Sequence, residues 1–184
     1  MILVDVGVWL AAIWGRHAHH RVARQWFDEQ RGDLVLCRVT QMSLLRLITN
    51  PAIMREDAVT RSEAWRVIDQ IWADDRVLWA EEPDQLEAVF RAISARDDNS
   101  HKLWTDDYLA AFAQASGASL VTLDTKLAGR YPSVQVEQLT WGGRLGAPGA
   151  ADQGRQARRI RSCQARAMRS AVLGAGSARS SADR

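Results

Sequence analysis

Three aspartates, Asp5, Asp106 and Asp124, are the residues of this chain whose type and position could support chemistry. Asp5 and Asp124 each follow a short apolar stretch, and Asp106 lies at the start of a helix-like run. In an open parallel sheet, the carboxyl ends of the buried strands and the helices that follow them meet at one edge, where ligands bind. We therefore expect these three carboxylates to share one cleft.

The chemistry of such a cleft depends on a cation. Carboxylates a few ångströms apart repel each other, and protonation or a cation must offset the repulsion. No His or Cys side chains stand at metal-ligand spacing, so the oxygen ligands favour Mg²⁺ or Mn²⁺ over zinc or copper. Such an ion suits phosphodiester hydrolysis, because it activates a water and neutralises charge on the phosphoryl group. The working hypothesis is a metal-dependent nuclease.

Each aspartate also has a structural interpretation. An Asp directly after a strand is a common turn or N-cap residue, since its side chain accepts hydrogen bonds from unpaired backbone N–H groups. A single aspartate of this kind is more often structural than catalytic. The joint pattern, in which residues 104–106 and 122–124 both end in aspartate, favours the catalytic interpretation.

Apolar periodicity predicts alternating strands and helices, and hence the elements that must position these residues. The predicted strands cover residues 2–5, 34–37, 76–79, 119–123 and 134–136. The predicted helices cover residues 8–14, 20–29, 41–49, 62–72, 83–95 and 106–115. This alternation favours an α/β fold with a central parallel sheet of about five strands and helices on both faces.

Several helix ends have a local cause in the sequence. Pro51 is predicted to end the third helix, because the residue before proline avoids the α region. Pro83 is predicted to lie in the first turn of the helix over residues 83–95. Gly117 is predicted to cap the helix that begins at Asp106, and the short turn after it leads into the strand before Asp124.

Four segments, residues 2–10, 37–51, 103–113 and 121–124, resemble the PIN-domain ribonucleases, specifically the VapC-type toxins of bacterial toxin–antitoxin pairs. The resemblance implies a PIN-like nuclease domain, which we place at residues 1–144. It implies that Asp5 and Asp106 hold Mg²⁺, or Mn²⁺, and that Asp124 completes the pocket or holds the ion through water. The expected activity is metal-dependent hydrolysis of RNA by a toxin, with a small cognate antitoxin and a second copy of the chain as partners.

Two departures from the family pattern suggest an alternative. Gly7 stands where the family usually has Asn, Ser or Thr, and Ser43 stands where many members have a glutamate. Loss of a supporting hydroxyl or amide beside Asp5 can lower metal affinity or activity by ~10 to 100-fold. The alternative is therefore a catalytically impaired PIN-like binding module that keeps its interaction with an antitoxin.

Residues near the three aspartates are expected to support them. Thr105 is predicted to cap the helix at Asp106, and Thr122 to orient the adjoining carboxylates through its hydroxyl. Asp107 is predicted to be a helix N-terminal acid favoured by the helix dipole. Trp104 is predicted to pack in the core beside the site.

The histidines His17, His19 and His20 could suggest zinc, but no Cys, Asp or Glu partner stands at the required spacing. Hydrogen bonding at a helix start is the favoured interpretation. Cys37 is predicted to be a small buried apolar residue. Arg46 could hold a phosphate, although a lone arginine on an amphipathic helix is more often solvated or paired with a surface acid.

The length of 184 residues, with 47% hydrophobic content, suits one substantial core. No segment approaches the ~20 continuous apolar residues of a membrane helix, so we expect a cytoplasmic protein without membrane contact.

The charge of the chain is unevenly distributed. Residues 145–184 contain eight arginines and two aspartates, a net charge of +6, and the total of +2 therefore leaves −4 for residues 1–144. The tail is rich in Gly, Ala, Ser and Arg, a composition that predicts a basic, low-complexity and disordered extension. The less favoured alternative is electrostatic binding of the tail to RNA phosphates.

Overall fold

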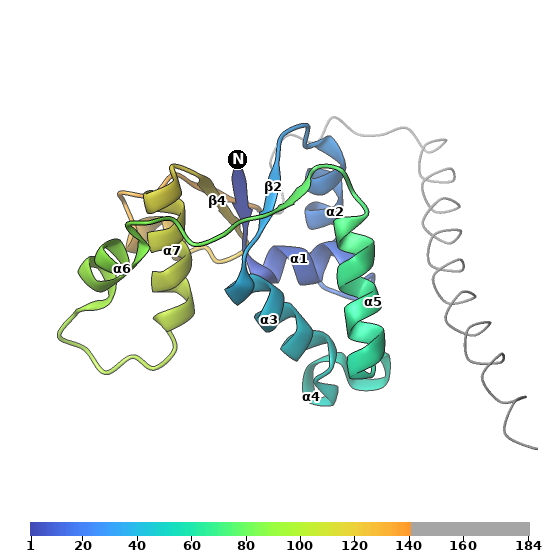
Figure 1. Ribbon diagram of the computed structural model, residues 1–184. Coiled ribbons are helices and arrows are strands. Elements are labelled where there is room, and N and C mark those ends of the chain that lie inside the picture. The colour runs from blue at the N-terminus through green and yellow to red at the C-terminus, as the bar shows by residue number, and fades with distance from the viewer. Residues whose placement is uncertain (141–184) are drawn as a thin grey trace, which may run out of the picture. The chain divides into compact units, whose positions relative to one another are not determined.

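The computed structural model describes residues 1–140, and only these are considered below (Figure 1). The predictions for the tail at residues 145–184, and for the domain boundary at residue 144, lie outside the described part.

The centre of the domain is a five-stranded sheet in which every neighbouring pair is parallel. Its strands are β1 (Ile2–Val4), β2 (Leu34–Leu36), β3 (Val77–Trp79), β4 (Ser119–Thr122) and β5 (Val136–Gln138). Their order across the sheet is β3-β2-β1-β4-β5. The predicted five-stranded parallel sheet is confirmed, and β1 is its middle strand.

Eight α-helices and one 3₁₀ turn accompany the strands within residues 1–140. They are α1 (Val6–Ile13), α2 (His20–Glu29), α3 (Arg38–Ile48), α4 (Pro51–Met54), the 3₁₀ turn η1 (Arg55–Asp57), α5 (Arg61–Trp72), α6 (Leu86–Ser94), α7 (Trp104–Ser116) and α8 (Leu127–Arg130). All six predicted helices are present; α2 has the predicted bounds, and the other five have shifted ends. The other three elements were not predicted because runs of three or four residues carry no measurable periodicity. None of the helices in residues 1–140 is long and apolar enough to cross a membrane.

Two hydrophobic cores lie on opposite faces of the sheet. One contains buried residues of α1, α2, α3 and α5, and the other contains those of α6 and α7, so helices cover both faces as expected (Figure 1). Successive strand residues alternate between the cores, as the pleat requires. Val4, Leu34, Leu36 and Val121 belong to the first core, and Leu3, Val35 and Leu120 belong to the second.

Two of the boundaries that differ from the prediction have a clear local cause. The last strand begins at Val136 rather than residue 134, because Val134 still belongs to a turn in which its N–H donates to the Tyr131 carbonyl (3.0 Å). Helix α6 begins at Leu86, whose N–H donates to the Pro83 carbonyl (2.9 Å), so Pro83 lies in a turn before the helix and not in its first turn.

Other helix ends follow the sequence closely. Asn50 caps α4, its side chain accepting the Ala52 N–H (2.9 Å), with Pro51 as the first helical residue. Gly117 has φ of 66° and ends α7 in the left-handed conformation that glycine adopts without steric cost. The predictions at Pro51 and Gly117 are confirmed.

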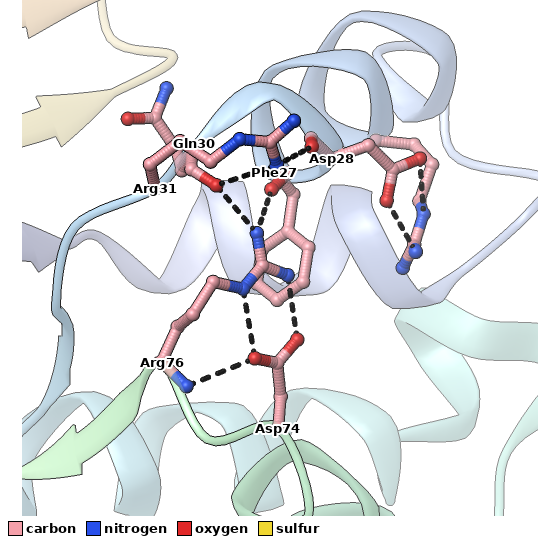
Figure 2. Close-up of polar contacts among 7 residues, drawn as sticks. Phe27, Asp28, Gln30, Arg31, Asp74 and Arg76 are labelled. Atoms are coloured by element: carbon pink, nitrogen blue, oxygen red, sulfur yellow. Dashed lines mark hydrogen bonds and ion pairs between the residues drawn. The ribbon is translucent and has the colours of Figure 1, made fainter.

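Arg76 fixes the C-terminus of α2 to the start of β3 (Figure 2). Its Nη1 donates to the carbonyls of Phe27 and Gln30, each at 2.9 Å. The carboxylate of Asp74 accepts from Nε (2.9 Å) and Nη2 (2.6 Å) of the same guanidinium, and these hydrogen bonds lower the pKa of Asp74. A cation at a helix C-terminus satisfies the last carbonyls and the helix dipole.

The histidines take part in local hydrogen bonding before and within α2. His20 Nδ1 lies 2.7 Å from the Ala11 carbonyl oxygen, and the backbone N–H of His19 donates to His17 Nδ1 (3.1 Å).

Cys37 is buried, as predicted, and stands at the N-cap of α3. Arg46 is exposed on α3.

Candidate active site

Asp5, Asp106 and Asp124 lie where the topology predicts, at the carboxyl edge of the two middle strands. Asp5 directly follows β1 and occupies the N-cap position of α1, and its N–H still donates to the Val121 carbonyl of β4 (3.0 Å). Asp124 stands two residues after β4, and Asp106 is the third residue of α7. Since β1 and β4 are paired neighbours, Asp5 and Asp124 leave the sheet side by side.

Thr122 connects two of these aspartates. Its hydroxyl donates to Asp5 Oδ2 (2.7 Å), and the hydroxyl oxygen of Thr122 accepts the Asp124 N–H (3.0 Å). The Thr122 side chain is completely buried, so both contacts are fixed by the sheet. The prediction that this threonine orients an adjoining carboxylate is confirmed for Asp5, whereas at Asp124 its contact is with the backbone N–H.

Arg130, the last residue of α8, connects Asp106 with Asp124. Its Nη1 lies 2.8 Å from Asp106 Oδ2 and 3.7 Å from Asp124 Oδ2, so the two carboxylates face each other across one guanidinium. The sequence interpretation missed this residue. The sequence signal that could have predicted it is an arginine six residues after Asp124, close enough to supply the positive charge that a cluster of carboxylates needs.

Burial and mutual repulsion act on the two predicted metal ligands. Burial raises the pKa of Asp5, and the charge of Asp124 acts in the same direction, while the Thr122 hydrogen bond opposes both. Burial also raises the pKa of Asp106, with a further contribution from Asp5 and an opposing one from Arg130. These carboxylates are therefore held in an environment that disfavours their charge until a cation arrives.

This environment predicts a pH-dependent stability. A carboxyl whose pKa is raised by folding stabilises the native state below its ordinary value of 3.8, and the contribution is lost as the pH rises through the raised value. We expect the free energy of unfolding of the metal-free protein, relative to an Asp5→Asn/Asp106→Asn variant, to fall as the pH rises. Urea unfolding in EDTA over a pH series measures it, and a pH-independent difference between the two proteins would contradict it.

Asp107 lies next to Asp106 but has a different environment. It is 4% exposed, its Oδ1 accepts the Tyr131 hydroxyl (2.6 Å), and Arg96 Nη2 lies 4.0 Å away. Asp107 is in the first turn of α7, as predicted. Its buried hydrogen bond to Tyr131 was not anticipated, because Tyr131 and Arg96 approach it only in the folded chain.

Two predictions at the start of α7 are wrong. The helix begins at Trp104 with Leu103 at the N-cap, so Thr105 lies inside the first turn and is not the cap. Trp104 is 57% exposed rather than packed in the core. The helix starts two residues earlier than predicted, so Trp104 is its first residue.

Gly7 leaves space beside the first aspartate. A Cβ at this position would lie 3.9 Å from Asp5 Oδ2, an ordinary van der Waals distance. A Cβ therefore fits at this position, and the missing side chain is a real difference in the surroundings of Asp5. The hydroxyl of Thr122, at the end of β4, already donates to Asp5 Oδ2.

The donor set fits a hard divalent ion. Within residues 1–140, no group of three or more His, Cys, Asp or Glu side chains is arranged closely enough to hold a metal ion. Mg²⁺, however, is commonly held by one or two carboxylates, with waters and substrate phosphates as its other ligands. Asp5 and Asp106 could meet that requirement: burial raises the pKa of both, and the charge of Asp5 contributes to the raised pKa of Asp106.

Comparison with known proteins gives consistent matches. The family model of the PIN domain matches residues 2–131, a span that includes all three aspartates. Ribonuclease VapC41 of Mycobacterium tuberculosis H37Rv is 41% identical over 145 residues, which cover 76% of this chain and 99% of the relative. Ribonuclease VapC31 of the same strain is 32% identical over 138 residues, covering 73% and 96% of the two chains.

Solved structures of similar fold include VapC20 of Mycobacterium tuberculosis, described as a sarcin-ricin loop cleaving toxin, with a TM-score of 0.54 and 16% identity. That match covers 70% of this chain and 94% of the other. VapBC2 from Rickettsia felis, bound to a fragment of promoter DNA, has a TM-score of 0.56 and 13% identity, and the match covers 76% and 100% of the two chains. At these identities the structures show a shared fold.

Proposed function

Because the chain belongs to the PIN domain family and, within it, to the VapC ribonucleases, we propose that it is a metal-dependent endoribonuclease that acts as the toxin of a toxin–antitoxin module. The single observation that carries the catalytic part of the proposal is the convergence of Asp5, Asp106 and Asp124 at one edge of the sheet, joined through Thr122 and Arg130.

The three aspartates have different roles in this proposal. Asp5 and Asp106 hold Mg²⁺ or Mn²⁺, and Asp124 completes the pocket. When bound, the ion supplies charge neutralisation at the phosphodiester and activation of a water. The Thr122 hydroxyl keeps Asp5 Oδ2 in one orientation, and the Thr122 oxygen holds the backbone at Asp124. A carboxylate held in this way loses little freedom when a ligand arrives.

Arg130 gives the site a permanent positive charge. In the structure it neutralises Asp106 and, at a longer distance, Asp124. Its guanidinium has five donors in a planar fork, the geometry that suits phosphate oxygens. In the proposed reaction Arg130 therefore pairs with these carboxylates when RNA is absent and donates to a phosphate of RNA when it is present.

The catalytically impaired binding module is the second candidate, and the space beside Gly7 is the observation that favours it. The Thr122 hydrogen bond to Asp5 favours the active enzyme, since the oxygen facing that space already has a donor. Titration with Mn²⁺ distinguishes the two, because an impaired site binds the ion far more weakly than the millimolar range.

The proposed partners are RNA, a small cognate antitoxin protein and a second copy of the chain, in the cytoplasm. Large exposed apolar side chains give the two protein partners surfaces to bury. They include Met42 (54% exposed), Trp72 (42%) and Leu78 (43%).

The proposal predicts a strict requirement for a divalent ion. Purified full-length protein is expected to cleave single-stranded RNA with Mg²⁺ or Mn²⁺, to stop in excess EDTA, and to resume when the ion is restored in excess. Gel analysis of end-labelled RNA measures cleavage. Cleavage that continues unchanged in EDTA would contradict a role for the ion, and a protein that never cleaves but binds antitoxin would favour the binding module.

A further inference from the structure

A hollow of about 310 Å³ lies beside the start of α7, outside the carboxylate cluster. It is lined by the end of α6, the connecting loop and the first turn of α7. The lining residues are Ser94, Arg96, Asp98, Asn99, Ser100, His101, Leu103, Trp104 and Asp107. Neither the core nor the proposed reaction accounts for it.

Trp104 is the largest apolar residue that lines this hollow. It is 57% exposed, the highest value among the exposed large hydrophobic residues of residues 1–140. The ring is nevertheless positioned, because Phe90 of α6 packs edge-on against it at a centroid distance of 6.2 Å. One aromatic face held in place and left open is suited to stacking with a planar ligand.

The rest of the wall is polar and partly fixed. Arg96 Nε donates to the Ile93 carbonyl (2.8 Å), and its guanidinium lies 5.4 Å from the centre of the Tyr131 ring. The Ser100 N–H donates to Asp98 Oδ1 (2.8 Å), which shapes the loop. A planar ligand on Trp104 would therefore meet hydrogen-bonding groups at its edges and a cation nearby.

The hollow adjoins the carboxylate cluster through two parallel contacts. Asp107 lines the hollow and accepts the Tyr131 hydroxyl, while its neighbour Asp106 accepts from Arg130, the neighbour of Tyr131. Two adjacent residues of α7 thus contact two adjacent residues at the end of α8. A ligand that reaches Asp106 with a phosphate can place an attached group in the hollow.

We propose that this hollow is the subsite for one unpaired nucleobase of the RNA, next to the bond that is cleaved, and that the base stacks on Trp104. This inference rests on the proposed ribonuclease function. A nucleobase is planar, carries hydrogen-bonding groups on its edge and is attached to the phosphate chain that the carboxylates would bind. Proteins recognise single-stranded RNA in this way, with bases stacked on aromatic rings.

The test measures RNA binding in full-length protein that carries Asp5→Asn, so that the RNA stays intact. The probes are short single-stranded oligoribonucleotides of A, C, G or U, and their dissociation constants are measured by fluorescence anisotropy. Adding Trp104→Ala is expected to weaken the best-bound oligonucleotide about tenfold or more, in the range that loss of one base stack produces. Trp104→Phe keeps an aromatic face and is expected to retain most of the affinity.

Two controls make the effect specific to a base on this ring. Trp65→Ala removes a similarly exposed tryptophan, 48% exposed on α5, and is expected to leave affinity unchanged. An oligomer of abasic ribose phosphates, which retains the charge, is expected to bind Asp5→Asn and Asp5→Asn/Trp104→Ala equally. Thermal melting shows whether each variant is folded.

The outcomes separate this inference from the proposed function. If wild type cleaves RNA but Trp104→Ala binds it as tightly as Trp65→Ala, the base subsite is wrong and the ribonuclease remains. If Trp104→Ala loses an antitoxin and keeps RNA, the hollow belongs to that protein and the inference is overturned. If no oligonucleotide binds and none is cleaved, the proposed function and the subsite are both wrong.

Discussion

Asp5→Asn is expected to lower the rate of RNA cleavage by about a hundredfold to a thousandfold, the scale on which loss of one catalytic electrostatic contact acts. The substitution removes the charge of a proposed metal ligand and preserves its shape. Asn can still accept the Thr122 hydroxyl, which lies 2.7 Å from Asp5 Oδ2, so the position of the side chain should survive. The measurement is the initial rate of cleavage of an end-labelled RNA in saturating Mg²⁺.

The same variant should be more stable than wild type in EDTA. Burial raises the pKa of Asp5, which means that folding disfavours its charged form, and the neutral amide avoids that cost. A higher Tm together with lost cleavage is the signature of a functional group held at the expense of stability.

Asp28→Asn is a matched control. Asp28 is an exposed aspartate of α2. Its carboxylate forms a salt bridge with Arg24 of the same helix (2.6 Å), and such surface pairs contribute little to stability. Its cleavage rate is expected to equal that of wild type. Normal cleavage by Asp5→Asn, or an equal loss in both variants, would remove Asp5 from the proposed active site.

Trp9→Ala is expected to lower the free energy of unfolding by about 3–5 kcal/mol, the usual cost of truncating a buried large aromatic residue. Trp9 is 1% exposed in the core of α1, α2, α3 and α5, and its ring meets Phe27 edge-on at a centroid distance of 5.8 Å. A loss of this size is a large part of the total stability of a typical domain. Urea unfolding measures it.

The effect should extend to the proposed active site, because Trp9 and Asp5 share the first turn of α1. The Trp9 N–H donates to the Asp5 carbonyl (3.1 Å), so loss of packing at Trp9 loosens the turn that holds the carboxylate. Trp9→Phe should cost less than Trp9→Ala, since the buried Trp9 Nε1 has no hydrogen-bond partner among the described residues. Trp65→Ala, at a 48% exposed position, should cost little; a similar loss in Trp65→Ala and Trp9→Ala would contradict this account.

The sequence was sufficient to predict the sheet and the convergence of the three aspartates. Short apolar runs separated by helical periodicity specify parallel strands, and residues that follow such strands meet at one edge. Asp5 and Asp124 could therefore be placed together, although 117 residues separate Asp5 from Thr122, which contacts both.

Side-chain partners across the fold could not be predicted in the same way. Arg130 and Tyr131 lie 24 residues after the aspartates they contact, in or next to a helix of four residues that periodicity does not reveal. The exposure of Trp104 depends on where α7 begins and on how Phe90 of α6 packs against its ring. Such contacts depend on the relative placement of whole helices, which local sequence does not contain.

The position of β1 in the middle of the sheet also affects the order in which the proposed active site assembles. Its residues are synthesised before those of the other four strands, but one of its two pairing partners, β4, is synthesised more than a hundred residues later. Until that strand has emerged, Asp5 has neither the Thr122 hydroxyl nor Asp124 beside it. A nascent chain from which β4 has not yet emerged therefore lacks the assembled carboxylate cluster, and we expect it not to cleave RNA through that site.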